Sequence, residues 1–201
     1  MSIKKPAVVG IRAHSGWAAL VAVAGNARAL EVLDRRQVVL VDAERRGAKQ
    51  PFHFAEPLAL KEAEAHLSRC AQISARLALG AVRQVLETLR ERGYGLTGCA
   101  ILTASGRSLP DLAAILASHA LIHAAEGQFF RDVFRDACQK LHIPVSPIRE
   151  RDLFTLAPAQ LRIPLADLKR QLADAGRTLG PPWTQDQKQA ALAGWVVLAS
   201  H

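Results

Sequence analysis

The sequence has few of the residues that stabilise small secreted proteins. Its three cysteines, Cys70, Cys99 and Cys138, are odd in number and lie far apart in a chain of 201 residues. No CxxC pair is present, which excludes a zinc ribbon built on such pairs, and nothing indicates a disulfide framework. We therefore expect the cysteines to be small buried side chains in a reducing compartment.

Long hydrophobic runs are also missing. No stretch approaches the roughly 18 uninterrupted apolar residues of a membrane span. The start, MSIKKPAVVG, lacks the apolar core and cleavage site of a signal peptide. We expect a cytoplasmic protein with no membrane partner. Aromatic residues make up only 5% of the chain, so the core should be mainly aliphatic.

Acidic residues are outnumbered by basic ones. The chain has 26 Lys and Arg against 18 Asp and Glu, and its formal net charge is +8. This balance favours a polyanionic partner, nucleic acid first, although basic side chains can equally serve to keep a surface soluble. With 50% hydrophobic residues, the chain is long enough for one well-buried core. We predict a single domain over 1–201.

The pattern of apolar residues predicts three strands followed by alternating helices and strands. The first strands are expected over 7–13, 17–24 and 29–41, with turn signals HSG and GNAR between them. Helical spacing then covers 58–92 and 108–141, and each helix is followed by a short apolar strand, GCAILTASG and IPVSPI. Further helices are predicted over 149–154, over 158–175 and after Thr184, which forms a capping box with Gln187. This order predicts an α/β mixed sheet with helices on both faces.

Polar residues interrupt the chain between its first two strands. In VVGIRAHSGWAAL, Arg12 and His14 follow a buried strand. The carboxyl ends of strands in such sheets form the usual binding crevice, so both side chains should border a cleft. A guanidinium there suits a phosphate. The alternative is a structural ion pair between Arg12 and a carboxylate such as Asp186 or Glu126.

Four stretches resemble the RuvC-type Holliday junction resolvases of the RNase H-like superfamily. VVGIRAHSGWAAL resembles their first strand, and CAILTASGRSLPDLAAILASHALIHAAEG resembles their fourth strand and central helix. LHIPVSPIRERDL is similar to their fifth strand, and WTQDQKQAALAGWVVLASH to their final helix. The resemblance implies an RNase H-like fold and a nucleic-acid partner.

The sequence departs from these resolvases at the residues that carry their chemistry. Their carboxylates on the first strand, the fourth strand and the last helix hold two divalent ions. Here the first-strand position is Arg12, and the fourth-strand position falls at Leu102 or Thr103. On the last helix only Asp186 matches, with Gln189 in its partner's place. We therefore expect the standard two-metal centre to be absent.

The stretch SHALIHAAEG carries a second group of polar side chains. His119, His123 and Glu126 fall at i, i+4 and i+7 of a predicted helix and so share one face. Two histidines four residues apart are good ligands for zinc or manganese, and the carboxylate could complete the set. The same line could also form a metal-free active site or a structural hydrogen-bond network.

Two loops offer further anion-binding candidates. Ser105 and Arg107 stand between a strand and a predicted helix start, where backbone N–H groups suit a phosphate, though a plain helix cap needs the same residues. Arg149 and Arg151 follow the fifth strand and could reach into the cleft, or could pair with the acids beside them.

Three functions remain open at this point. The first is a nucleic-acid-binding or phosphate-binding protein that lacks the two-metal centre. The second is a hydrolase of a phosphate-containing substrate, such as a divergent nuclease, whose candidate catalytic residues are His14, His119, His123, Glu126 and Asp186. The third is a non-catalytic adaptor in a bacterial complex, in which a long Ala/Leu-rich helix could also form a homodimer face.

Overall fold

The computed structural model describes residues 4–26, 28–104 and 108–200. Five strands form one sheet: β1 (Lys5–His14), β2 (Trp17–Asn26), β3 (Ala29–Val39), β4 (Tyr94–Thr103) and β5 (Val145–Arg149). Their order across the sheet is β3-β2-β1-β4-β5. β1, β2 and β3 pair antiparallel, whereas β4 and β5 run parallel to β1. The predicted mixed sheet is confirmed, with β5 at its edge.

The helices are α1 (Pro51–Ala55), α2 (Leu60–Glu91), α3 (Leu112–Leu116), α4 (His119–Lys140), α5 (Leu153–Leu161), α6 (Leu165–Leu179) and α7 (Gln185–Leu198). A short 3-10 turn, Glu150–Asp152, joins β5 to α5. Thr184 and Gln187 form the predicted capping box at the start of α7. None of the described helices is long and apolar enough to cross a membrane.

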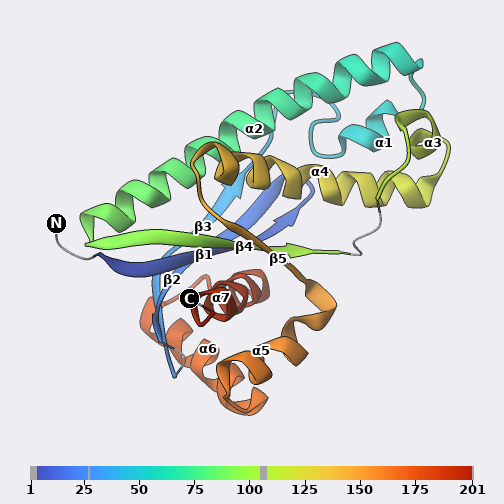
Figure 1. Ribbon diagram of the computed structural model, residues 1–201. Coiled ribbons are helices and arrows are strands. Elements are labelled where there is room, and N and C mark those ends of the chain that lie inside the picture. The colour runs from blue at the N-terminus through green and yellow to red at the C-terminus, as the bar shows by residue number, and fades with distance from the viewer. Residues whose placement is uncertain (1–3, 27, 105–107, 201) are drawn as a thin grey trace.

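Helices cover both faces of the sheet (Figure 1). α2 and α4 lie on one face, α5, α6 and α7 lie on the other, and α1 and α3 gather at the end where α2 and α4 begin. The strands alternate accordingly: Val9 and Ile11 of β1 belong to the α2/α4 core, whereas Val8 packs toward α7. Because side chains alternate along a strand, Arg12 and His14 share the α7 face with Val8.

α7 packs directly on β1 because both elements have glycine at the crossing. A Cβ on Gly10 would lie 1.8 Å from the carbonyl oxygen of Ala190, and a Cβ on Gly194 would lie 3.1 Å from the backbone nitrogen of Gly10. This close approach brings the first turn of α7 to the carboxyl end of β1. It therefore decides what Arg12 can contact.

Three sequence predictions need correction. The helix predicted from Ser108 starts later, because Asp111 caps the start of α3, and it is two helices, because the backbone at Ser118 is extended before α4 begins. The helices predicted over 149–154 and 158–175 are divided differently: Glu150–Asp152 is a 3-10 turn, and α5 continues through Pro158 to Leu161. The left-handed backbone of Arg162, with φ of 55°, ends α5, and α6 begins at Leu165. The polar connection over 43–57 contains the helix α1, which begins with Pro51, a residue suited to a first helical turn.

Candidate functional site

Four polar side chains meet where β1, β5 and α7 end or begin, and we call them the strand-edge cluster. They are Arg12, His14, Glu150 and Asp186. Arg12 and His14 come from the last residues of β1, Glu150 follows β5, and Asp186 lies in the first turn of α7. The sequence analysis placed Arg12 and His14 side by side and considered an ion pair of Arg12 with Asp186; the structure brings these three together and adds Glu150.

Arg12 holds both carboxylates of the strand-edge cluster. Its Nε and Nη2 atoms lie 3.4 and 3.1 Å from the two carboxylate oxygens of Glu150, and its Nη1 donates to Asp186. His14 Nε2 lies 2.9 Å from the same Asp186 oxygen, and the His14 ring stacks on Trp17 at 4.5 Å. The ion-pair alternative for Arg12 is therefore the arrangement observed, with Asp186 as predicted and with Glu150 where Glu126 was considered.

In the strand-edge cluster one guanidinium charge lies against two carboxylate charges. Burial lowers the pKa of Arg12, but the hydrogen bond and charge of Glu150 and the charge of Asp186 outweigh it, so the pKa is raised. The side chains of Arg12 and Asp186 are 20% and 22% exposed. A guanidinium so placed satisfies two carboxylates that would otherwise be half-buried anions.

The remaining positions at this edge offer few metal ligands. Leu102 is buried in the α7 core, and the side-chain oxygen of Gln189 is buried without a hydrogen-bond partner among the described residues. Arg149 and Arg151 are both exposed and share Asp152, at 2.5 and 3.5 Å. The predicted anion-binding residues Ser105 and Arg107 lie outside the described residues.

A second group of polar side chains lies in the helical layer on the other side of the sheet from α7, between α1 and the start of α4. We call His53, His119 and His123 the histidine cluster. One ring nitrogen from each lies within 4.8 Å of the others, and His119 Nε2 is 3.0 Å from His123 Nε2. Across the described residues, this is the one group of three or more His, Cys, Asp or Glu that meets that distance. The predicted pair His119 and His123 thus acquires a third histidine, which the sequence analysis did not identify.

Glu126 lies behind the histidine cluster rather than in it. It is only 3% exposed, and one carboxylate oxygen accepts from the backbone N–H groups of Phe52 and His53 at 3.2 and 3.3 Å. The same oxygen lies 2.8 Å from His53 Nδ1. Burial raises the pKa of Glu126, and these hydrogen bonds lower it in part. Glu126 therefore caps α1 and orients His53, instead of pointing with His119 and His123 as a third ligand.

The two groups are separate. Among the described residues no hydrogen bond, ion pair or ring contact joins the strand-edge cluster to the histidine cluster. A single active site that combines His14 with His119, His123 and Glu126 is therefore not assembled in this structure.

A row of arginines on α2 is a third feature, and the sequence analysis overlooked it. The row consists of Arg69, Arg76, Arg83 and Arg90, all exposed. Seven residues are close to two helical turns, so the four side chains follow one line opposite the buried face of α2. None of the four takes part in an ion pair within the part of the chain that the structure describes. The signal available in the sequence was their regular spacing of seven.

The sequence matches no protein-family profile and no curated protein. Solved structures do match. The RuvC of Thermus thermophilus in complex with a Holliday junction substrate superimposes with a TM-score of 0.56 over 94% of this chain and 90% of that chain, at 12% identity. A second structure of Thermus thermophilus RuvC gives 0.55 over 94% and 92%, also at 12% identity.

The chain has a RuvC-like fold. The predicted α/β, RNase H-like architecture and the resemblance to RuvC-type resolvases are thus confirmed at the level of the fold. On this RuvC-like scaffold, the strand-edge cluster lies at the carboxyl ends of β1 and β5, and the histidine cluster lies on the helical layer of α2 and α4.

Proposed function

We propose that this RuvC-like chain binds nucleic acid through its basic surface and does not cut it by a two-metal mechanism. The observation that carries the proposal is the position of Arg12. Its guanidinium occupies the end of β1, where the resolvases it resembles have an aspartate, and it engages the carboxylates of both Glu150 and Asp186. The RuvC-like fold is present, and the guanidinium of Arg12 is already paired with both carboxylates at this strand end.

Electrostatics argues against two divalent ions at the strand edge. Two such ions close together require several carboxylate ligands to offset their charge. The strand-edge cluster has two carboxylates, and a fixed positive charge already lies between them. A cation entering this site would have to displace the guanidinium and would be repelled by it.

The basic surface argues for a polyanionic partner. The arginine row spans 21 residues of α2, or about 32 Å at 1.5 Å per residue, which is close to one turn of a DNA duplex. The net charge of +8 has the same sign. Four aligned guanidiniums would repel the same face of a second copy, so this surface of α2 suits phosphates better than a homodimer.

Binding is tested with a four-way DNA junction, because a similar fold was solved with a Holliday junction. A linear duplex and a single strand serve as comparisons, from about 50 to 200 mM salt. We expect affinity to fall steeply with salt. The double variant Arg76→Gln/Arg83→Gln should lower the slope of log affinity against log salt by about 2, roughly 1 for each lost phosphate contact.

The matched control is Arg170→Gln/Arg177→Gln. It removes the same charge from α6, where Arg170 and Arg177 pair with Asp167 and Asp174 at 2.9 and 2.6 Å. It should leave the salt slope within experimental error. Equal effects of the two double variants, or no binding at about 0.1 M salt, would reject the proposed interface.

Cleavage is tested on the same junction with Mg²⁺ and with Mn²⁺. We expect intact strands after incubation, because the strand-edge cluster has no carboxylate free of Arg12. Metal-dependent cleavage that is lost in Asp186→Asn would contradict this part of the proposal, since it would require Asp186 to leave Arg12 and bind an ion.

A further inference from the structure

The three imidazoles of the histidine cluster approach one another from different directions. The ring planes of His119 and His123 cross at 82°, and those of His53 and His123 cross at 68°. His119 Nε2 and His123 Nε2 are 3.0 Å apart. Two nitrogens bound to one tetrahedral zinc ion at about 2.0–2.1 Å would lie about 3.3–3.4 Å apart. The His119–His123 separation is therefore within a few tenths of an ångström of the value expected at a zinc ion, and one ring nitrogen of His53 lies within 4.8 Å of the ligand nitrogens of both.

The orientation of His53 is fixed from behind. A carboxylate accepts hydrogen bonds, so Nδ1 of His53 carries the hydrogen that faces Glu126 at 2.8 Å. This tautomer leaves Nε2 of His53 with a free lone pair. A carboxylate that holds the second nitrogen of a metal-ligating histidine is the usual support of such a ligand.

Burial of Glu126 is a second and independent observation. Its side chain is 4% exposed, and one of its two carboxylate oxygens is buried with no hydrogen-bond partner among the described residues. A buried, partly unsatisfied carboxylate is costly unless a positive charge lies near. A divalent cation on the far side of the His53 ring would supply that charge.

A hydrogen bond between His119 and His123 alone does not explain the whole arrangement. That pair needs one N–H donor and one acceptor, and no third ring. His53 lies on another helix, α1, with its ring centroid 4.6 Å from that of His123. A hydrogen bond between His119 and His123 does not explain why His53 lies between these two rings and the buried carboxylate of Glu126.

We propose that His53, His119 and His123 bind a Zn²⁺ ion, with Glu126 as the positioning residue for His53. Three neutral nitrogen ligands suit zinc better than manganese, which favours oxygen ligands. His119 and His123 are exposed, so the fourth coordination position faces solvent and is open to water. The ion would join α1 to α4, two elements that are far apart in the sequence.

The test uses full-length protein without a histidine tag. Zn²⁺ is titrated in competition with a chromophoric chelator, and Co²⁺ is titrated alone for the visible absorption of a tetrahedral nitrogen site. We expect one ion per chain. His123→Ala should weaken binding by at least about 100-fold, and Glu126→Gln, which still accepts from the backbone N–H groups, by about 10- to 100-fold.

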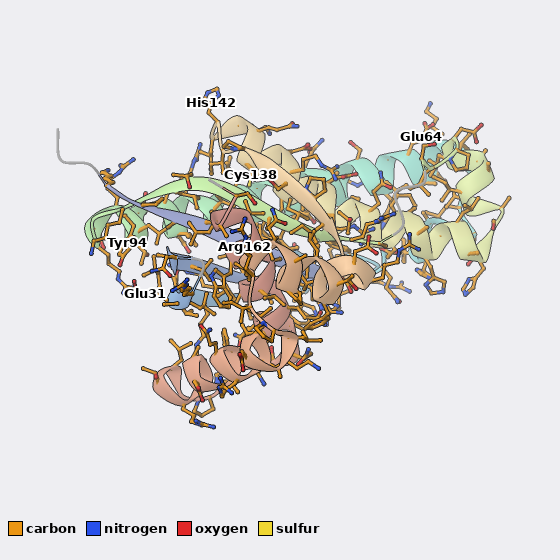
Figure 2. All side chains as sticks on the ribbon, turned by 60° about the horizontal axis from the view of Figure 1, so that its bottom comes forward. Glu31, Glu64, Tyr94, Cys138, His142 and Arg162 are labelled. Atoms are coloured by element: carbon orange, nitrogen blue, oxygen red, sulfur yellow. The ribbon has the colours of Figure 1, made fainter. Side chains whose placement is uncertain are left out.

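The matched control is His142→Asn. His142 follows the far end of α4, more than 20 residues or about 30 Å along the helix from His119, and Figure 2 shows it well apart from Glu64, which lies near the start of α2. Its backbone φ is 56°, a conformation that asparagine tolerates. We expect binding within twofold of the unaltered protein.

Three results would overturn the proposed zinc site. They are the absence of stoichiometric Zn²⁺ binding, equal affinities of the unaltered protein and His123→Ala, and an unchanged affinity in Glu126→Gln. Circular dichroism of each variant establishes that it is folded. The site is independent of nucleic-acid binding, so Arg76→Gln/Arg83→Gln should bind Zn²⁺ normally.

Discussion

The strand-edge cluster and the histidine cluster differ in the charges of the side chains that they bring together. In the first, a guanidinium lies against two carboxylates, and opposite charges satisfy one another. In the second, three imidazoles of the same kind converge, and a buried carboxylate stands behind one of them. In the first cluster each carboxylate already has Arg12 as its partner, whereas the second gathers three imidazole nitrogens within 4.8 Å of one another with no opposite charge among them.

From this difference we infer that the strand-edge cluster has a structural role and that the histidine cluster is the better candidate for binding an ion. A cluster that contains its own counter-charge stabilises the fold and has little left for a ligand. A cluster of like donors gains most when a cation arrives from outside. The resemblance to the resolvases led us to look for metal at the strand edge, whereas the zinc site that we propose lies in the helical layer.

The largest expected effect comes from separating the two elements that build the strand-edge cluster. Gly10→Ala would place a Cβ 1.8 Å from the Ala190 carbonyl oxygen and force α7 away from β1. We expect a loss of about 3 kcal/mol or more in the free energy of unfolding, measured by urea denaturation. The control is Gly80→Ala on α2, where no atom lies within 4 Å of the added Cβ. It should be neutral or stabilise slightly, and equal losses in both variants would contradict this account.

The second effect concerns the histidine cluster. At a Zn²⁺ concentration 100-fold above the dissociation constant, the unaltered protein should gain about 2.7 kcal/mol in the free energy of unfolding, because only the folded chain presents all three ligands. His123→Ala should gain little. Arg12→Met should gain as much as the unaltered protein, since Arg12 belongs to the other cluster. A gain in His123→Ala equal to that of the unaltered protein would place the ion elsewhere.

The third effect tests whether the strand-edge cluster is complete. Arg12→Met leaves Glu150 and Asp186 without their common partner, and we expect a loss of about 1 to 2 kcal/mol, because the side chains are partly exposed. Adding Asp186→Asn to Arg12→Met should cost less than the sum of the two single losses, as it removes one stranded charge. Strict additivity in thermal or urea unfolding would mean that the pair is not coupled.

Much of the fold could be predicted from the sequence because its signals are local. Continuous short apolar runs indicated β1 and β2, and the capping box at Thr184 indicated the start of α7. The break between α3 and α4 was missed because the helical period of apolar residues continues across it. The break depends on one extended residue, Ser118, which periodicity does not detect.

The candidate sites were predicted only in part, because each combines residues that lie far apart in the chain. His119 and His123 share one helix and were found together, but His53 lies in a five-residue helix within a polar stretch. Arg12 was correctly placed near the carboxyl end of the first strand. Its partner Glu150 is 138 residues away, and only the pairing of β4 with β5 brings it there.

The smallest expected effect is a pH dependence of the free energy of unfolding that arises where α1, the helix that carries His53, packs on α2. His66 of α2 is buried, and its ring stacks on Phe54 of α1 at 4.5 Å. Burial, followed by the charges of Arg69 and Arg45, lowers the pKa of His66, so the folded chain keeps this ring neutral. The unfolded chain takes up the proton more readily, so this contribution is fully present above pH 6.5 and is lost as the pH falls below it.

The measurement compares urea unfolding of the unaltered protein and of His66→Leu from pH 7 to pH 5, with a chelator present to keep the histidine cluster free of metal. We expect the unaltered protein to lose more stability over this range than His66→Leu does. The control variant Gly80→Ala should retain the pH dependence of the unaltered protein, because it changes no titratable group and no atom outside its own helix backbone lies near the added Cβ. If His66→Leu kept the full pH dependence, the titrating group would lie elsewhere, and α1 would not be held by a neutral His66.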